Sequence, residues 1–168
     1  MMKLNLGART TKIPGFKNVD IKKMPGVDIV ADISMLPLRD NSVSEIYASH
    51  CLEHFSHTKT LDVLKEWNRV LEKDGTIHIA VPDFDTIVKL YKETGFMTEW
   101  IKNCLWGDQI YREAYHYVCF TYSTLLNMMS DAGFKNIKKI EDMPYGIKDC
   151  SKLIVGGMKI SLNMEASK

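Results

Sequence analysis

The chain has 168 residues, of which 45% are hydrophobic and 26% are charged, and its formal net charge is +1. This length suits one domain with its own buried core, and the nearly neutral charge gives no general attraction to nucleic acid or to anionic membranes. No apolar run approaches the ~18 residues of a membrane span, and the N-terminus begins with a strand pattern rather than a signal peptide, so we expect a cytoplasmic protein. The four cysteines contain no CxxC pair, which favours free thiols over a disulfide framework or a zinc knuckle.

The first twenty residues contain two short apolar runs separated by a polar loop. Residues 3–6 and 17–20 are predicted strands; Gly7 follows the first, and Asp20 ends the second. A glycine after the first strand lets a ligand approach the backbone, and an acid at the end of the second is placed to accept hydrogen bonds from ribose hydroxyls. The interval of 13 positions between them is shorter than the roughly 20 of a dinucleotide-binding unit. The first crossover helix is therefore short or absent, which favours a nucleoside without phosphates, because a pyrophosphate needs a helix N-terminus.

Strands and helices alternate in the next part of the chain. Three further strands are predicted at residues 28–32, 45–49 and 76–81. Apolar residues at helical spacing predict a helix before the last of these strands, capped by Thr58 or Thr60 and ended by Asp74-Gly75. A second helix is predicted to begin after Asp83, which is its expected N-cap.

Residues 96–122 interrupt this alternation and hold 8 of the 16 aromatic residues of the chain. We expect this aromatic-rich insert to form a wall or lid over a substrate pocket. A helix over residues 124–132 and a final strand pair at residues 134–140 and 152–160 are predicted after it, and residues 161–168 are expected to fray. The pattern as a whole predicts one α/β domain over residues 1–160, with a doubly wound, mostly parallel sheet.

A series of short motifs follows in a characteristic order: Leu4-Asn-Leu-Gly7, Asn18-Val-Asp20-Ile, Ala31-Asp32, Leu36-Pro-Leu, Glu45-Ile-Tyr-Ala-Ser-His50, Leu52-Glu-His54, Arg69-Val-Leu-Glu-Lys-Asp-Gly75, Ile79-Ala-Val-Pro-Asp-Phe84 and Ala132-Gly-Phe134. This succession resembles the class I S-adenosylmethionine-dependent methyltransferases, in particular their small, short-looped bacterial branch. The resemblance covers residues 3–160. It implies a Rossmann-like sheet of seven strands in the order 3-2-1-4-5-7-6, with the last strand antiparallel.

The resemblance also implies how S-adenosylmethionine is bound. Gly7 would lie in the loop under the methionine part, and Asp20 would accept hydrogen bonds from the ribose hydroxyls. Asp32 and the backbone of Ile33 would meet the adenine edge. A nucleoside cofactor of this kind agrees with the missing crossover helix.

The first motif departs from the pattern of the family at two positions. Asn5 stands where an acid is usual, and Arg9 stands where a second glycine is usual. Asn5 can still accept a hydrogen bond, with less attraction for the ammonium group of the cofactor. Arg9 could bind the methionine carboxylate as a fork, swing outward or occlude the site.

Three histidines are candidates for contact with the reacting groups. Ser49 and His50, at the end of the fourth strand, would lie near the sulfonium by resemblance, and His116 could take a proton from a hydroxyl or amine nucleophile. His116 could equally hold a loop of the insert in place. The candidates for substrate contact are Gln109, Tyr111 and His54.

Residues 50–54 match the H-x-x-E-H pattern of inverted zinc peptidases. That pattern needs both histidines on one helix face, and here it begins at the end of a predicted strand, so no metal site is predicted. Glu53 and His54 are then helix-start residues or the polar floor of a substrate site.

The leading hypothesis is transfer of a methyl group from S-adenosylmethionine to an oxygen or nitrogen nucleophile of a small molecule. The branch that the chain resembles is associated with sugar and polysaccharide pathways, so a sugar is one candidate acceptor. The alternative is a non-catalytic relative that binds the cofactor or a partner protein, because Asn5 and Arg9 alter the first motif. A nicotinamide oxidoreductase lacks its glycine fingerprint here. No nucleic-acid or membrane partner is expected, and a homodimer is left open.

Overall fold

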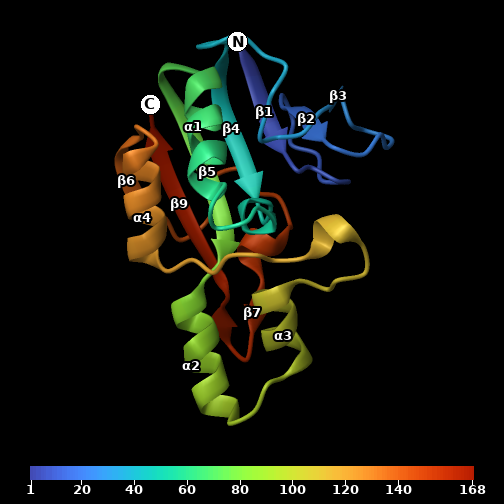
Figure 1. Ribbon diagram of the computed structural model, residues 1–168, viewed down its shortest axis with the longest axis vertical. Coiled ribbons are helices and arrows are strands. Elements are labelled where there is room, and N and C mark those ends of the chain that lie inside the picture. Colours follow the sequence, from blue (N-terminus) through green and yellow to red (C-terminus); the bar gives the residue numbers. More distant parts are fainter.

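The computed structural model describes residues 1–168, and its centre is a seven-stranded sheet in the order β3-β2-β1-β4-β5-β9-β6 (Figure 1). The strands are β1 (Met2–Leu6), β2 (Lys17–Asp20), β3 (Ile29–Val30), β4 (Val43–Ser49), β5 (Leu71–Pro82), β6 (Lys135–Lys139) and β9 (Ser161–Ser167). The first five are parallel, and β9 runs antiparallel to both β5 and β6. Because β7 (Ile154–Val155) and β8 (Met158–Lys159) form a separate hairpin, β9 is the seventh strand of the sheet and the predicted order is confirmed.

Helices cover one face of this sheet. α1 (Thr60–Val70) and α4 (Tyr122–Asp131) pack against alternate strand residues in a core of 26 buried side chains. Trp67 of α1 is fully buried there, and its indole Nε1 donates to the carbonyl of Ile33 at 2.8 Å. α1 thereby stabilises the loop after β3 as well as the sheet.

Loops rather than helices cover the other face. Residues 13 and 16 of the first loop, and residues 140–147, pack on the buried rings and methyl groups of this face. Loops leave backbone carbonyls that a helix would satisfy internally, and buried amides of the sheet donate to them. Asn5 donates to the carbonyl of Thr11 at 2.9 Å, and Asn163 donates to those of Glu141 and Ser151 at 3.0 and 3.1 Å. The predicted absence of the first crossover helix is confirmed.

The predicted frayed tail over residues 161–168 is wrong, because residues 161–167 form β9 in the interior of the sheet. Leu162, Met164 and Ala166 alternate with polar residues and are at most 2% exposed. β6 therefore pairs with β9 and not with residues 152–160, which form a short 3-10 helix, η3 (Cys150–Lys152), and the β7–β8 hairpin. Gly156 and Gly157 form the turn of this hairpin, and the last strand of the sheet therefore begins after it, at Ser161 rather than at residue 152.

Three local predictions also need correction. α1 begins at Thr60 after Lys59, and no side chain caps it. It ends at Val70, while Asp74-Gly75 lies in the irregular first part of β5. β3 is only two residues long, and before it the Asp28 side chain accepts the backbone N–H of Asn18 at 2.8 Å. The predicted cap of Asp83 on α2 (Phe84–Thr94) is confirmed, and of the two cap candidates for the following predicted helix, Thr121 and Ser123, it is Thr121 that caps α4.

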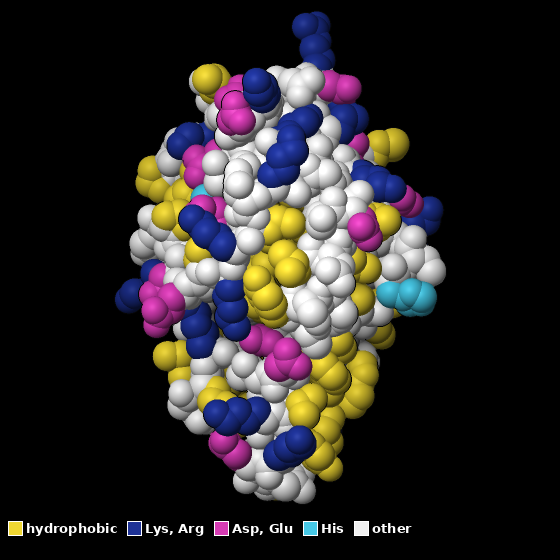
Figure 2. Space-filling model, turned by 90° about the vertical axis from the view of Figure 1, so that its left-hand side faces the viewer, with side chains coloured by type: hydrophobic (Ala, Val, Ile, Leu, Met, Phe, Trp, Pro, Cys, Tyr) yellow, Lys and Arg dark blue, Asp and Glu magenta, His cyan; other side chains and the backbone are white.

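Residues 96–122 form α3 (Glu99–Trp106), η2 (Arg112–Ala114) and the segments around them, below the carboxyl edge of the sheet (Figure 1). α2, α3 and the β7–β8 hairpin share a small core around Ile87, Leu90 and Ile101. Six of the eight aromatic side chains of the insert are more than a third exposed: Phe96, Trp100, Trp106, Tyr115, Tyr117 and Tyr122. Figure 2 shows hydrophobic side chains along one edge of this lower part. None of the helices combines the length and apolarity that crossing a membrane requires.

Glu66 and Arg69 of α1 hold the loop between β3 and β4. Glu66 Oε1 accepts the backbone N–H of Leu36 at 2.7 Å, and Arg69 donates to Glu66 Oε2 at 2.7 Å and to the carbonyl of Leu38 at 2.9 Å. The hydrogen bond from Arg69 is the main reason why the pKa of Glu66 lies below its ordinary value of 4.5.

We therefore expect Glu66→Gln to lower the free energy of unfolding by about 1–2 kcal/mol at neutral pH. Because the folded pKa is depressed, this stabilisation is present above pH 4.5 and is lost as the pH falls through the folded pKa. Urea unfolding at several pH values measures the difference between the variant and the parent, which should shrink in acid. Asp62→Asn, on the same helix and exposed, is the control, and a difference that grows below pH 4.5 would contradict this account.

Candidate active site

The candidate site lies at the carboxyl edge of the parallel strands, where the ends of β1, β2 and β4 come together. The chain turns sharply after Ser49, with His50 at a φ of 49° and its backbone N–H donating to the carbonyl of Ala80 at 2.8 Å. The short helix η1 (Leu52–His54) follows at once. Residues from the end of β4 are thus placed beside the loop that follows β1.

Gly7 allows these two segments to touch. Its φ is +62°, and a Cβ at this position would lie 2.8 Å from Cβ of Cys51. A larger residue would push the loop after β1 away from the turn after β4. Burial raises the pKa of the Cys51 thiol, so this cysteine packs as an apolar group and does not act as a nucleophile.

Asp20 organises the loop between the first two strands. Its carboxylate is buried and accepts the backbone N–H groups of Arg9 at 3.0 Å and Lys22 at 2.9 Å. Each carboxylate oxygen has a further lone pair, so Asp20 can still accept bonds from hydroxyl groups. Its position at the end of β2 fits the predicted ribose contact.

Asp32 and Ile33 lie at the end of the neighbouring strand, β3. Oδ1 of Asp32 accepts the backbone N–H and the hydroxyl of Ser34, while Oδ2 has no partner within the chain. The backbone N–H of Ile33 also donates to no atom of the chain. One free acceptor beside one free donor is the pair that an adenine edge requires.

The insert reaches across to the same loop. The ring of Tyr111 lies 5.6 Å from Cζ of Arg9 and 4.0 Å from Nζ of Lys22, and Lys22 forms an ion pair with Glu113 at 2.9 Å. Arg9 has a φ of 45° and is exposed, with its guanidinium directed to this ring. The cation–π contacts therefore place Tyr111 over the segment that Asp20 organises.

The remaining candidates occupy separate positions. Asn5 lies on the loop-covered face of the sheet, where its amide nitrogen donates to Thr11 and Asn18. Ser49 is the last residue of β4. Gln109 is exposed, at a φ of 56°, and donates to the carbonyl of Trp106 at 3.3 Å.

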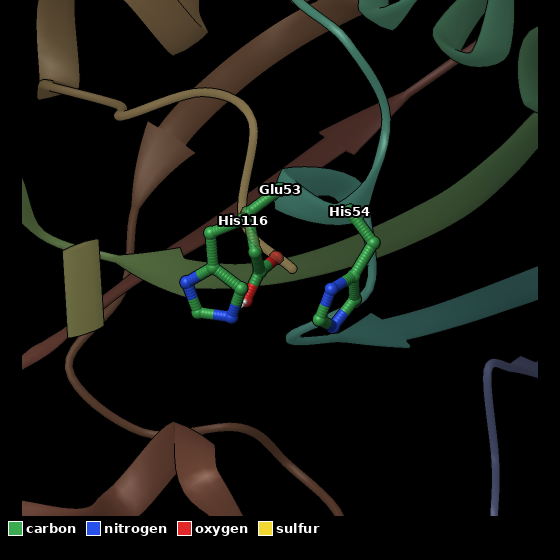
Figure 3. A group of neighbouring side chains, drawn as sticks. All are labelled: Glu53, His54 and His116. Carbon is green, nitrogen blue, oxygen red and sulfur yellow. Dashed lines mark ion pairs between the residues drawn. The ribbon is translucent and has the colours of Figure 1, made fainter. Parts of the chain in front are cut away.

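The structure brings three predicted histidines, His50, His54 and His116, together around one buried acid, Glu53, and Figure 3 shows the last two beside it. The Glu53 side chain is fully buried; its Oε1 lies 3.3 Å from Nδ1 of His50 and 3.9 Å from Nε2 of His116. The rings of His54 and His116 are 4.9 Å apart at 69°. His50 is held from its other side, where Nε2 lies 3.0 Å from Oγ of Ser161.

Hydrogen bonds to backbone carbonyls set the tautomers of two of these histidines. Nδ1 of His54 lies 3.0 Å from the carbonyl oxygen of Tyr115, and Nδ1 of His116 lies 3.0 Å from that of Cys104. A carbonyl oxygen only accepts, so both Nδ1 atoms carry the hydrogen. Nε2 of each neutral ring is then a free acceptor.

The charges in the cluster follow from burial and proximity. Burial alone raises the pKa of Glu53, but the imidazoles of His50, His54 and His116 outweigh it and hold this pKa below its ordinary value. Burial lowers the pKa of His116, with Glu53 opposing the shift. At neutral pH the cluster therefore contains an ionised carboxylate and a neutral His116 that can accept a proton.

Sequence reasoning missed the central position of Glu53, although its place in the H-x-x-E-H pattern was a usable signal. It also missed Ser161, because residues 161–168 were assigned to a tail. The approach of His116 to this acid depends on a backbone bond from Tyr117 N–H to the carbonyl of Glu53 at 2.8 Å. No local pattern encodes that contact.

Comparisons with known proteins agree with this geometry. Residues 11–79 match the model of a family described as a methyltransferase domain. A search of curated proteins found no match. An S-adenosylmethionine-dependent methyltransferase from Thermotoga maritima shares the fold with a TM-score of 0.65 at 17% identity, over 99% of this chain and 82% of that one.

Two further solved structures show the same fold. A S-adenosylmethionine-dependent methyltransferase from Methanosarcina mazei has a TM-score of 0.61 at 18% identity, over 99% of this chain and 92% of that one. The 1,6-didemethyltoxoflavin-N1-methyltransferase of Burkholderia thailandensis, solved with 1,6-didemethyltoxoflavin and S-adenosylhomocysteine, has a TM-score of 0.62 at 16% identity. That match covers 99% of this chain and 70% of the other.

Proposed function

We propose that this chain is a class I S-adenosylmethionine-dependent methyltransferase that methylates an oxygen or nitrogen nucleophile of a small molecule, which the matched methyltransferase domain and the shared fold support. The observation that carries the proposal is the arrangement of two groups of residues at one edge of the sheet. Acceptors and donors that suit a nucleoside lie at the ends of β2 and β3. A neutral histidine beside a buried carboxylate lies in the cluster beyond the end of β4.

The ends of the first three strands provide the cofactor contacts. Asp20 accepts hydrogen bonds from the ribose hydroxyls, and the free Oδ2 of Asp32 and N–H of Ile33 meet the adenine edge. Gly7 leaves room under the methionine part because no Cβ stands there. These contacts supply affinity and orientation.

The histidine cluster receives the acceptor. When bound, S-adenosylmethionine supplies an electrophilic methyl group on sulfur. The protein has to hold the nucleophile close to that methyl and in line with it. A hydroxyl or amine also has to lose a proton, and Nε2 of His116, opposite the charge of Glu53, is a group of the chain that can accept it.

A small acceptor is favoured by the aromatic side chains around this cluster. The insert provides exposed aromatic side chains next to it, among them Tyr115, Tyr117 and Trp106. Aromatic surfaces of this kind suit the apolar faces of sugar rings and small heterocycles. The neutral net charge gives no corresponding support for a nucleic-acid substrate.

Calorimetric titration with S-adenosylmethionine and S-adenosylhomocysteine tests the cofactor site. We expect binding by the parent chain and a loss of about 100-fold or more in Asp20→Ala, because two charge-assisted hydrogen bonds to the ribose are removed. Asp28→Ala is the matched control, since Asp28 also accepts a backbone N–H near this loop but lies beyond β2.

Two results would contradict the proposal. One is the absence of heat with either ligand at millimolar concentration. The other is equal affinity in the parent and in Asp20→Ala when both show the same circular dichroism. Lost binding in Asp20→Ala together with a changed fold would call for Asp20→Asn, whose single amide oxygen keeps an acceptor for one of the N–H groups of Arg9 and Lys22 and should still weaken ribose binding.

A further inference from the structure

Three side chains with the donor atoms of a metal site converge in the histidine cluster. These atoms are a carboxylate oxygen of Glu53 and one ring nitrogen each of His54 and His116, and they all lie within 4.8 Å of one another. Figure 3 shows the carboxylate of Glu53 between the two imidazole rings, with His116 approaching from the insert and the other two from η1. We propose that this cluster binds a divalent first-row transition-metal ion.

The buried carboxylate supports the presence of a positive ligand. The Glu53 side chain is fully buried, and neither of its oxygens accepts a hydrogen bond of good geometry, since its nearest donor is Nδ1 of His50 at 3.3 Å from Oε1. A buried acceptor without a partner is costly, and a buried charge without one costs more. A water molecule has two hydrogens for three acceptors, whereas a cation satisfies all three.

The orientation of the histidines gives independent support. Both direct Nδ1–H to a backbone carbonyl, that of Tyr115 for His54 and that of Cys104 for His116. Metal-binding histidines are held in this way, since the bond orients the ring and leaves Nε2 free for the ion. One histidine comes from η1 and the other from a loop 62 residues further on, and the chain orients both alike.

The ligand set determines the class of ion. Two imidazoles and one carboxylate suit Mn²⁺, Fe²⁺, Co²⁺ or Zn²⁺, whereas Mg²⁺ and Ca²⁺ prefer sites built from oxygen. Bonds of about 2.0–2.2 Å in a tetrahedral site require the ligand atoms to approach one another by up to about 1.5 Å. His54 and His116 are partly exposed, and the movement requires small shifts of both rings together with the segments that carry the carbonyls of Tyr115 and Cys104. Three protein ligands leave coordination positions open, as in catalytic rather than structural sites.

The ion would also take part in the proposed methyl transfer, and this part of the inference rests on the proposed function. An acceptor hydroxyl bound at an open position is held in place, and its pKa falls, so that its proton passes to solvent. The oxygen then forms its bond to the methyl group as the bond from methyl to sulfur breaks. His116 is in that case a ligand of the ion, and the task of accepting the proton passes from it to water.

Mn²⁺ binding to the chelator-treated protein is the direct test. Mn²⁺ is preferred to Zn²⁺ as the probe because four free thiols in this chain also attract Zn²⁺. We expect one equivalent to bind, counted by the loss of the free-ion electron paramagnetic resonance signal, and the melting temperature to rise. Glu53→Gln, His54→Ala and His116→Ala should each weaken binding by about 100-fold or more.

His57→Ala is the matched control, because His57 lies three residues beyond His54 and is exposed. It should bind Mn²⁺ as the parent does. The proposal is overturned if the parent binds no Mn²⁺, or if well-folded Glu53→Gln and His54→Ala bind as tightly as His57→Ala. S-adenosylhomocysteine titration of the same samples separates the two proposals: intact cofactor binding without Mn²⁺ binding overturns only the metal site, and the reverse overturns only the cofactor site.

Discussion

A chain that ends at Ile160 is expected not to form the native sheet. Such a chain lacks β9, which pairs with β5 over seven residues and also with β6. The loss of Leu162 and Met164 alone removes two fully buried side chains from the main core. Large buried side chains contribute about 2–5 kcal/mol each, and a domain of this size has a total stability of about 5–15 kcal/mol. Circular dichroism and thermal unfolding measure the outcome.

A point variant in β9 distinguishes the effect of losing its buried side chains from the effect of shortening the chain. Leu162→Ala should lower the free energy of unfolding by about 2–5 kcal/mol, while Ser167→Ala, in the same strand with its side chain on the opposite face and partly exposed, should change it little. Cooperative unfolding of the truncated chain at the parental temperature would contradict this account of β9.

Gly107→Ala is expected to have the largest effect of any single substitution near the cluster. Gly107 ends α3 with φ and ψ of 75° and 172°, a backbone conformation that glycine alone adopts readily. A Cβ there would lie 1.7 Å from the carbonyl oxygen of Ala114 and 3.2 Å from Cδ2 of His116. The loop from 107 to 116 would have to open, and His116 would leave Glu53. We expect a loss of about 3 kcal/mol or more in stability, together with loss of Mn²⁺ binding.

Gly95→Ala is the matched control for this substitution. Gly95 also ends a helix, at a φ of 72°, but a Cβ there would meet nothing within 4 Å. Its cost should therefore be only the ~1 kcal/mol of a left-handed residue with a side chain. Equal losses in the two variants, measured by urea unfolding, would show that backbone strain rather than the position of His116 decides the effect.

Most of the local structure follows from signals within a few residues. Asp83 and Thr121 cap helices because their side chains accept backbone N–H groups one or two residues inside the helix. The close spacing of Gly7 and Asp20 leaves no room for a helix, and the structure has a loop there. Where local signals conflict, prediction is weaker: Asp74-Gly75 has the composition of a helix stop and lies in the irregular start of β5.

The expectation that residues 161–168 fray is wrong because their pairing in the sheet is not visible in any local pattern. Residues 161–167 alternate between apolar and polar side chains, which is a strand signal. Their place between two other strands depends on pairing with β5 and β6, which lie about 80 and 30 residues earlier in the chain. Two glycines of the β7–β8 hairpin set where this last strand begins.

The sequence by itself determined the absence of the first crossover helix and the acids at or just after the ends of β2 and β3, because each depends on spacing and composition over short ranges, whereas the order of the strands was implied only by the family resemblance. Only the tertiary structure decided what the histidines do. Glu53 and His54 come from η1, and His116 comes from a loop held by Gly107 and by the bond from Tyr117 to Glu53. Three acceptors that are ordinary in isolation form the proposed cation site because the fold brings them within 4.8 Å of one another around a buried carboxylate.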